Sequence, residues 1–161
     1  MATFIYPSAE WLEEVRNLYS AEFEGKLKSL SGHFAYQLNA EPSWGLEKSI
    51  FMAMKLEAGK LVKMDHCSEE DAQKSDFILS ADVKVWKSIL TGQDKFVGAF
   101  MGERIKMTKG ETVSAMALAP HANTIVTAMT HMDLKYPDEL SPDEFAEFKS
   151  KFAAYRAKRG V

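Results

Sequence analysis

Four histidines and a single cysteine are the side chains of this chain best suited to act as a base, a nucleophile or a metal ligand. Asp65, His66 and Cys67 are consecutive, which raises the possibility of a proton relay or a metal pair. Neighbouring residues on a strand point to opposite faces, however, and no second cysteine completes a metal-binding pattern. We therefore predict no catalytic residue and no metal site. The histidines to which we assign structural or surface roles are His33, His66, His121 and His131.

Soft and aromatic apolar side chains are concentrated in the second half of the chain. Methionine has a flexible, polarizable side chain that repacks around ligands of different shapes. This set could line an adaptable cavity, or it could form an ordinary core, and periodicity alone does not separate the two. Its members are Trp86, Phe96, Phe100, Met101, Met107, Met116, Met129 and Met132.

The first half predicts two helices followed by three strands. Ser8 is a suitable N-cap for a helix that carries apolar residues at helical spacing, and a second helix is predicted over residues 21–30. Alternating apolar residues then predict a strand over 34–38 and another over 49–57. The Ala58-Gly59 pair joins the latter to a strand over 60–66 as a hairpin, so three antiparallel strands form a meander.

The second half alternates strands with short helices. After a polar loop over 67–74, we predict a strand over 75–80 and a helix that Asp82 caps and Gly92 ends. An apolar turn or helix over 95–101 and a fifth strand over 104–109 follow. An apolar segment over 113–132 must break near Pro120. The motif Ser141-Pro142-Asp143-Glu144 then predicts the start of a final helix over 141–159 with a Phe-rich face.

Composition limits the class of protein. The chain has 161 residues and 46% hydrophobic residues, enough for one core, so we expect a single α+β domain over residues 1–161. A net charge of −3 without a basic cluster argues against nucleic-acid binding. No apolar run is long enough to span a bilayer. The single cysteine, Cys67, suits a reducing compartment and leads us to expect a cytoplasmic location.

The order of elements between Leu27 and Met132 resembles the sterol carrier protein type-2 family. The most specific similarity lies in Phe77-Ile78-Leu79-Ser80-Ala81-Asp82, in Trp86-Lys87-Ser88-Ile89-Leu90-Thr91-Gly92, in Ala99-Phe100-Met101-Gly102, and in Ile105-Lys106-Met107 with Gly110. These short motifs are mostly structural, so they support the fold more strongly than a particular ligand.

The resemblance implies a five-stranded, largely antiparallel sheet with helices over one face and an apolar tunnel between them. It further implies noncovalent binding or transfer of fatty acids, acyl-CoA, sterols or other lipids, without a catalytic residue, metal or cofactor. In its light we expect the soft apolar set to line the tunnel. The expected ligand-binding residues are Trp86, Leu90, Phe96, Phe100, Met101, Met107, Met116, Ile125 and Met129.

Two alternatives remain open on the sequence. A small isomerase or hydrolase would use Asp65, His66 or His121 as a base. An accessory subunit would instead dock on a partner through the Phe-rich C-terminal helix, which we otherwise expect to cover the tunnel mouth. The basic residues of that helix could also contact anionic lipid surfaces transiently, although we favour a solvated helix end as their explanation. They are Lys149, Lys151, Arg156, Lys158 and Arg159.

Overall fold

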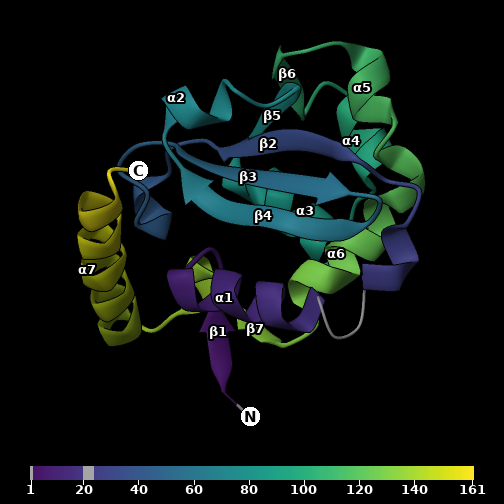
Figure 1. Cartoon of the computed structure of the whole chain (residues 1–161). Helices are drawn as coiled ribbons and strands as arrows, with labels where there is room; N and C mark the ends of the chain where they lie inside the picture. Colours follow the sequence, from purple (N-terminus) through teal and green to yellow (C-terminus); the bar gives the residue numbers. More distant parts are fainter. Residues whose placement is uncertain (1, 20–23) are drawn as a thin grey trace.

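A computed structural model describes residues 2–19 and 24–161 and contains a five-stranded sheet with strand order β4-β3-β2-β5-β6 (Figure 1). The β2–β5 pair is parallel, whereas β2–β3, β3–β4 and β5–β6 are antiparallel. The sheet is therefore mixed but largely antiparallel, and the expected α+β fold class is confirmed. The sheet strands are β2 (Gly32–Leu38), β3 (Ile50–Glu57), β4 (Lys60–Cys67), β5 (Phe77–Ala81) and β6 (Lys106–Lys109).

Helices and short turns occupy most of the remaining described chain. The α-helices are α1 (Ala9–Leu18), α2 (Glu69–Ala72), α3 (Val83–Leu90), α4 (Phe96–Met101), α5 (Thr112–Met116), α6 (Ala122–Thr130) and α7 (Pro142–Arg159). The 3₁₀ turns are η2 (Glu24–Leu27), η3 (Pro42–Trp44), η4 (Ala119–His121) and η5 (Pro137–Glu139). The α5–η4–α6 series bears out the predicted break at Pro120, because proline cannot supply the N–H that an uninterrupted helix needs.

The predicted meander is present as β2, β3 and β4. Its hairpin turn uses Ala58 at φ 50° and Gly59 at φ 82°, the left-handed values that a two-residue turn between twisted strands requires. Gly59 is also in close contact with another segment, since a Cβ atom there would lie 2.5 Å from the carbonyl carbon of Leu27. The turn residue therefore fixes both the hairpin and the approach of η2.

The two faces of the sheet are covered differently. Phe34 and Leu38 of β2 belong to the main buried cluster, together with residues of α1, α3 and α6, and Tyr36 packs against it. In Figure 1 α1 and α6 lie below the sheet, on this face. A second, smaller cluster includes Ala35 and Ile78 on the opposite face and Ala72 of α2.

Helix α2 lies within the stretch that the sequence predicted to be a loop, so that prediction is wrong in part. Ser68 caps this short helix by accepting a hydrogen bond from the Asp71 backbone at 3.1 Å. Its cap was missed because one helical turn is too short to display a helical period. The second predicted helix, over 21–30, falls partly outside the described residues, and residues 24–27 form the 3₁₀ turn η2.

A small parallel sheet ties the start of the chain to its end. Strand β1 (Thr3–Ile5) pairs with β7 (Asp133–Lys135), an arrangement that local periodicity could not predict. Helix α7 follows, and it begins as expected: the Ser141 hydroxyl accepts from the Glu144 backbone at 3.2 Å, while the Glu144 carboxylate accepts from the Ser141 backbone at 2.9 Å. In Figure 1 α7 stands beside the sheet, away from α4 and α5.

Candidate functional site

An apolar cavity lies between the sheet and the helices α3, α4 and α6. Strands β2, β3 and β5 supply one wall because their alternate side chains point to this face. Every described residue that lines the cavity is apolar or aromatic, and none carries a charge. The lining residues are Tyr6, Phe34, Tyr36, Met54, Leu79, Trp86, Ile89, Leu90, Phe96, Leu118, Ala122, Ile125, Val126 and Met129.

Hydrogen bonds and ring contacts hold the aromatic part of the wall. The indole N–H of Trp86 donates to the Gln37 carbonyl at 2.9 Å and so attaches α3 to β2. The Trp86 ring lies 5.1 Å from the Tyr36 ring, tilted by 56°. On the opposite side, the indole N–H of Trp11 donates to the Met129 carbonyl at 2.9 Å and anchors α6 to α1. These contacts fix the position of α3 and α6 relative to the sheet.

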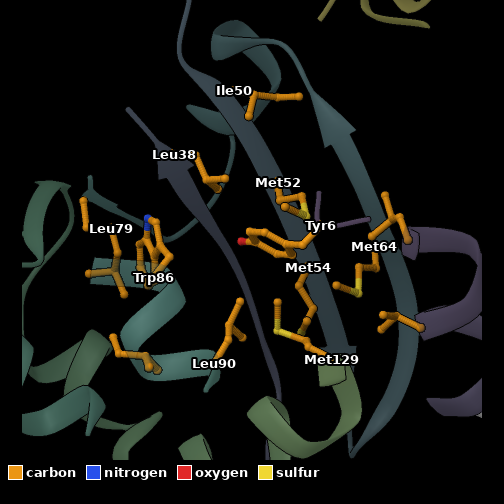
Figure 2. Packing of buried hydrophobic residues seen from close by; sticks show 14 of the residues in the cluster. Tyr6, Leu38, Ile50, Met52, Met54, Met64, Leu79, Trp86, Leu90 and Met129 are labelled. Carbon is orange, nitrogen blue, oxygen red and sulfur yellow. The ribbon is translucent and has the colours of Figure 1, made fainter. Parts of the chain in front are cut away.

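Five of the nine residues expected to bind ligand lie on this wall. They are Trp86, Leu90, Phe96, Ile125 and Met129. Figure 2 shows Trp86, Leu90 and Met129 around the space between the helices and the sheet, together with Met54 and Leu79 from the strands. Eight residues of the wall lie on α-helices and four on strands of the sheet.

The other four expected residues lie outside the cavity lining. Phe100 packs beside Phe96 with ring centroids 5.9 Å apart, and Met107 of β6 packs against the core. Met116 is partly buried at the end of α5. Met101 is 69% exposed, because one residue beyond Phe100 the helix has turned its side chain away from the face that Phe96 and Phe100 share. The inward orientation expected for Met101 is therefore wrong.

Nine lining residues were not among those expected. Phe34 and Tyr36 were detectable, since their alternation had already marked a buried strand face. Tyr6 gave no local signal because β1–β7 pairing brings its segment to the cavity. The full set is Tyr6, Phe34, Tyr36, Met54, Leu79, Ile89, Leu118, Ala122 and Val126.

The free volume of the cavity is about 90 Å³. This is smaller than the roughly 150 Å³ cavity that accommodates benzene in a protein core, and well below the roughly 300–1,000 Å³ of typical ligand pockets. The lining side chains therefore fill most of the space between the helices and the sheet. A lipid chain could enter only if some of them moved apart.

A shallow depression of about 150 Å³ adjoins the cavity on the solvent side of Phe96 and Val126. It shares four lining residues with the cavity and adds polar ones from the α3–α4 connection and α6. Asp94 on its rim pairs with Arg104. The shared residues are Ile89, Phe96, Ala122 and Val126, and the added ones are Gly92, Asp94, Lys95, Asn123 and Thr127.

Helix α7 contributes no residue to the apolar cavity. Phe148 and Phe152 are 5% and 3% exposed, and their rings stack 5.4 Å apart. Arg156 is 7% exposed and donates to the carbonyls of Lys48 and Ser49 at 2.8 and 2.6 Å. Phe148 and Phe152 belong to the main core cluster, so the helix is part of the core. The expectation that it covers a tunnel mouth stays a prediction.

The candidate bases of the enzyme alternative do not converge on the cavity. Asp65 pairs with Arg16 at 3.0 Å on one face of β4. His66 points to the other face, where its Nδ1 atom lies 2.7 Å from the Tyr155 hydroxyl, and burial lowers its pKa to about 3. No group of three metal-ligating side chains occurs among residues 2–19 and 24–161. These positions give no catalytic constellation within the described chain.

Two wider depressions, of about 440 and 520 Å³, flank helix α7. One lies against the segment that contains Thr3, Phe4 and Glu10, and the other against Gly45 and Glu47. Charged side chains line both, in contrast to the apolar cavity. Within the part of the chain that the structure describes, no helix is long and apolar enough to cross a bilayer.

Comparisons with known proteins agree with this architecture. A sterol carrier protein 2 crystal structure aligns with a TM-score of 0.64 and 19% identity over 78% of this chain and 97% of the other. A Thermus thermophilus solution structure, described as that of a conserved hypothetical protein, possibly sterol carrier protein, aligns with a TM-score of 0.62 and 22% identity over 77% of this chain and 87% of the other. The sterol carrier protein domain 2 of Helicoverpa armigera aligns with a TM-score of 0.51 and 14% identity over 73% of this chain and 86% of the other. At these identities the similarity establishes the fold.

No curated protein sequence matches the chain. A model of the SCP-2 sterol transfer family matches residues 12–122, which is more than half of the 161-residue chain. Tyr6, which lines the cavity, precedes the matched region, and Met129 follows it. On the strength of this match and of the fold it accompanies, the chain belongs to the SCP-2 sterol transfer family.

Proposed function

We propose that this protein binds a hydrophobic lipid noncovalently in the apolar cavity and carries it, or presents it to an enzyme. The observation that carries the proposal is the uncharged wall between β2, β3, β5 and the helices α3, α4 and α6. Membership of a lipid-transfer family supports the same reading. A fatty acyl chain or a related lipid is the ligand class that such a wall would accept.

Burial of hydrocarbon would supply the affinity. Each methylene group removed from water contributes about 0.8 kcal/mol, so a long acyl chain can offset the cost of its immobilisation. A wall of flexible apolar side chains measures mainly volume, and one methylene changes such binding by only about 1–3 kcal/mol. We therefore expect ligands of several chain lengths to bind.

Entry requires the lining side chains to part, and we place the entrance at the depression beside Phe96 and Val126. Both residues are partly buried and lie on helices rather than on the sheet. The rim of the depression is polar, which would suit the polar end of a lipid. Trp86, Leu90, Phe96, Ile125 and Met129 would then contact the chain. Phe100, Met107 and Met116 would pack behind the lining residues without touching the ligand. We propose no ligand contact for Met101.

Retained ligand tests the proposal most directly. The purified protein would be examined by native mass spectrometry, and organic extraction would identify any lipid released. Addition of palmitate or palmitoyl-CoA should raise the midpoint of thermal unfolding. At a free ligand concentration one hundred times the dissociation constant, the free energy of unfolding should increase by about 2.7 kcal/mol. Absence of any retained lipid, together with an unchanged midpoint for every lipid tested, would contradict the proposal.

Cys67 and the basic residues of α7 bear on where the protein would act. The Cys67 thiol is buried, and burial raises its pKa to about 11, so it is held in the unreactive thiol form. A cytoplasmic location stays the prediction that the single cysteine supports. Three of the basic side chains that could contact an anionic membrane already have other contacts in α7. Arg156 is buried, Lys149 pairs with Glu47 and Lys151 pairs with Glu147, which weakens the case for such contact.

A further inference from the structure

The hydroxyl of Tyr6 is buried in the wall of the apolar cavity and makes no hydrogen bond of good geometry among the described residues, although the hydroxyl of Tyr36 lies near enough to interact with it. Tyr6 is 0% exposed. Figure 2 shows its ring between the methionines of β3 and Trp86, with the hydroxyl directed toward the side on which Trp86 lies. Buried side-chain hydroxyls nearly always have a partner, so an unpaired one in a cavity wall needs an explanation, and contact with a ligand supplies one.

A backbone hydrogen bond and ring contacts fix the position of the Tyr6 side chain. The Tyr6 backbone N–H donates to the Lys135 carbonyl at 2.9 Å, next to the β1–β7 pairing. Its ring packs edge-on against Trp11 at 4.7 Å and lies 5.6 Å from the ring of Tyr136. A ring held on these sides cannot swing its hydroxyl out to solvent. The segment that carries Tyr6 precedes residues 12–122, which the family model matches.

A second phenol faces the same cavity. The hydroxyl of Tyr36 donates to the Met52 sulfur at 3.2 Å, a weak acceptor, and it also interacts with the hydroxyl of Tyr6. Burial raises the pKa of Tyr6 and of Tyr36, and each phenol also influences the pKa of the other. Both groups thus remain neutral hydrogen-bond donors at physiological pH.

The charge of the wall restricts what these donors can recognise. The described lining contains no lysine, arginine or histidine that could neutralise a buried carboxylate. The Tyr6 hydroxyl is also covered by neighbouring side chains, so a ligand reaches it only as it widens the cavity. An uncharged oxygen is therefore the chemistry that fits.

We propose that Tyr6, assisted by Tyr36, recognises an uncharged oxygen in the bound lipid, either a hydroxyl or a carbonyl. This inference rests on the proposed function, and it makes Tyr6 a specificity-determining residue. Hydrocarbon burial would set the overall affinity, while the Tyr6 hydroxyl would favour lipids that bring an oxygen to that point over chains that lack one.

Three ligands of similar length test the inference: dodecanol, 2-dodecanone and dodecane. Their dissociation constants would be measured for the full chain by displacement of a fluorescent apolar probe. Tyr6→Phe should lower the affinity for dodecanol or 2-dodecanone by about 2- to 10-fold, the range that one hydrogen bond provides, and leave the affinity for dodecane unchanged. The ligand that loses affinity identifies the oxygen as a hydroxyl or a carbonyl. Tyr136→Phe, which removes a hydroxyl from a neighbouring ring outside the cavity lining, should change none of the three constants.

An equal loss for dodecane, or no loss for either oxygen-containing ligand, would overturn the inference. Tyr6→Phe should fold at least as stably as the wild type, because it removes an unpaired hydroxyl. If it does not fold, Tyr36→Phe is assessed by the same three constants. Failure of the wild type to bind any of the three would overturn the proposed function, whereas equal binding with no effect of Tyr6→Phe would overturn the inference alone.

Discussion

The Nδ1 atom of His66 lies 2.7 Å from the hydroxyl oxygen of Tyr155, so a hydrogen bond joins strand β4 to the C-terminal helix. The imidazole also packs edge-on against Phe152, at 5.9 Å between ring centroids. His66 is 1% exposed. A residue that suggested a catalytic base in the sequence is thus part of the contact between α7 and the sheet.

This contact makes stability depend on pH. Burial lowers the pKa of His66 from about 6.5 to about 3, with smaller contributions from the nearby arginines. Between these two values the unfolded chain takes up a proton that the folded chain excludes, so stability is fully present above about pH 6.5 and is lost as the pH falls toward 3. Urea unfolding at pH 7.0, 5.5 and 4.5 should show a slope from this group of at most about 1.4 kcal/mol per pH unit.

His66→Gln removes the titrating group, so its stability should fall less steeply over the same pH range. Tyr155→Phe keeps the buried imidazole and removes only its partner. It should lose about 1–3 kcal/mol at pH 7. Equal slopes for the wild type and His66→Gln would contradict the assigned role of His66.

Arg156 should be far more important for stability than the other basic residues at the end of α7. Its guanidinium donates to the backbone carbonyls of Lys48 and Ser49, the two residues that precede strand β3. Arg156→Ala leaves these carbonyls unpaired, so we expect a loss of about 2–4 kcal/mol in the free energy of unfolding. Arg159→Ala serves as the control, since Arg159 is exposed, and its expected loss is below about 1 kcal/mol. Similar losses for the two variants in urea unfolding would show that the buried contact is unimportant.

Phe148→Asp distinguishes a core helix from a partner-docking helix. Phe148 stacks on Phe152 and lies 3.4 Å from the position that a Gly45 Cβ atom would occupy. Truncation of a buried phenylalanine costs about 3–5 kcal/mol, and a buried carboxylate adds to this. The variant should therefore unfold at a much lower temperature, measured by circular dichroism. Ala146→Asp, on the exposed face of the same helix, should stay close to the wild type. A fully stable Phe148→Asp protein that fails to associate with a partner would favour docking.

Ala122→Phe should block the cavity without unfolding the protein. Ala122 lines both the cavity and the adjoining depression. A phenyl group there would occupy space that a lipid chain needs, so palmitate affinity should fall by about tenfold or more, equivalent to about 1.4 kcal/mol. Overpacking should lower stability by no more than about 1–3 kcal/mol. The control is Ala117→Phe, at an exposed position between α5 and η4. Unaltered palmitate binding in Ala122→Phe would place the ligand elsewhere.

The local elements follow from the sequence because short-range rules govern them. Alternation in β2, the two-residue turn after β3 and the capping motif at Ser141 each depend on residues close together in the chain, and the structure contains all three. The family resemblance then predicted the largely antiparallel order of five strands. Helix α2 was missed because a single turn carries too little periodicity.

Tertiary structure decided which of the apolar residues form the cavity. Met101 and Phe96 belong to the same short helix, yet only the packing of α4 determines that Phe96 lines the cavity while Met101 is exposed. Tyr6 reaches the wall through the pairing of Thr3 with Asp133, a contact between distant parts of the chain that no local pattern encodes. His66 and Arg156 look functional as isolated residues and prove to be buried contacts of α7. Sequence periodicity specifies which face of an element is apolar, whereas the long-range pairing of elements specifies what that face meets.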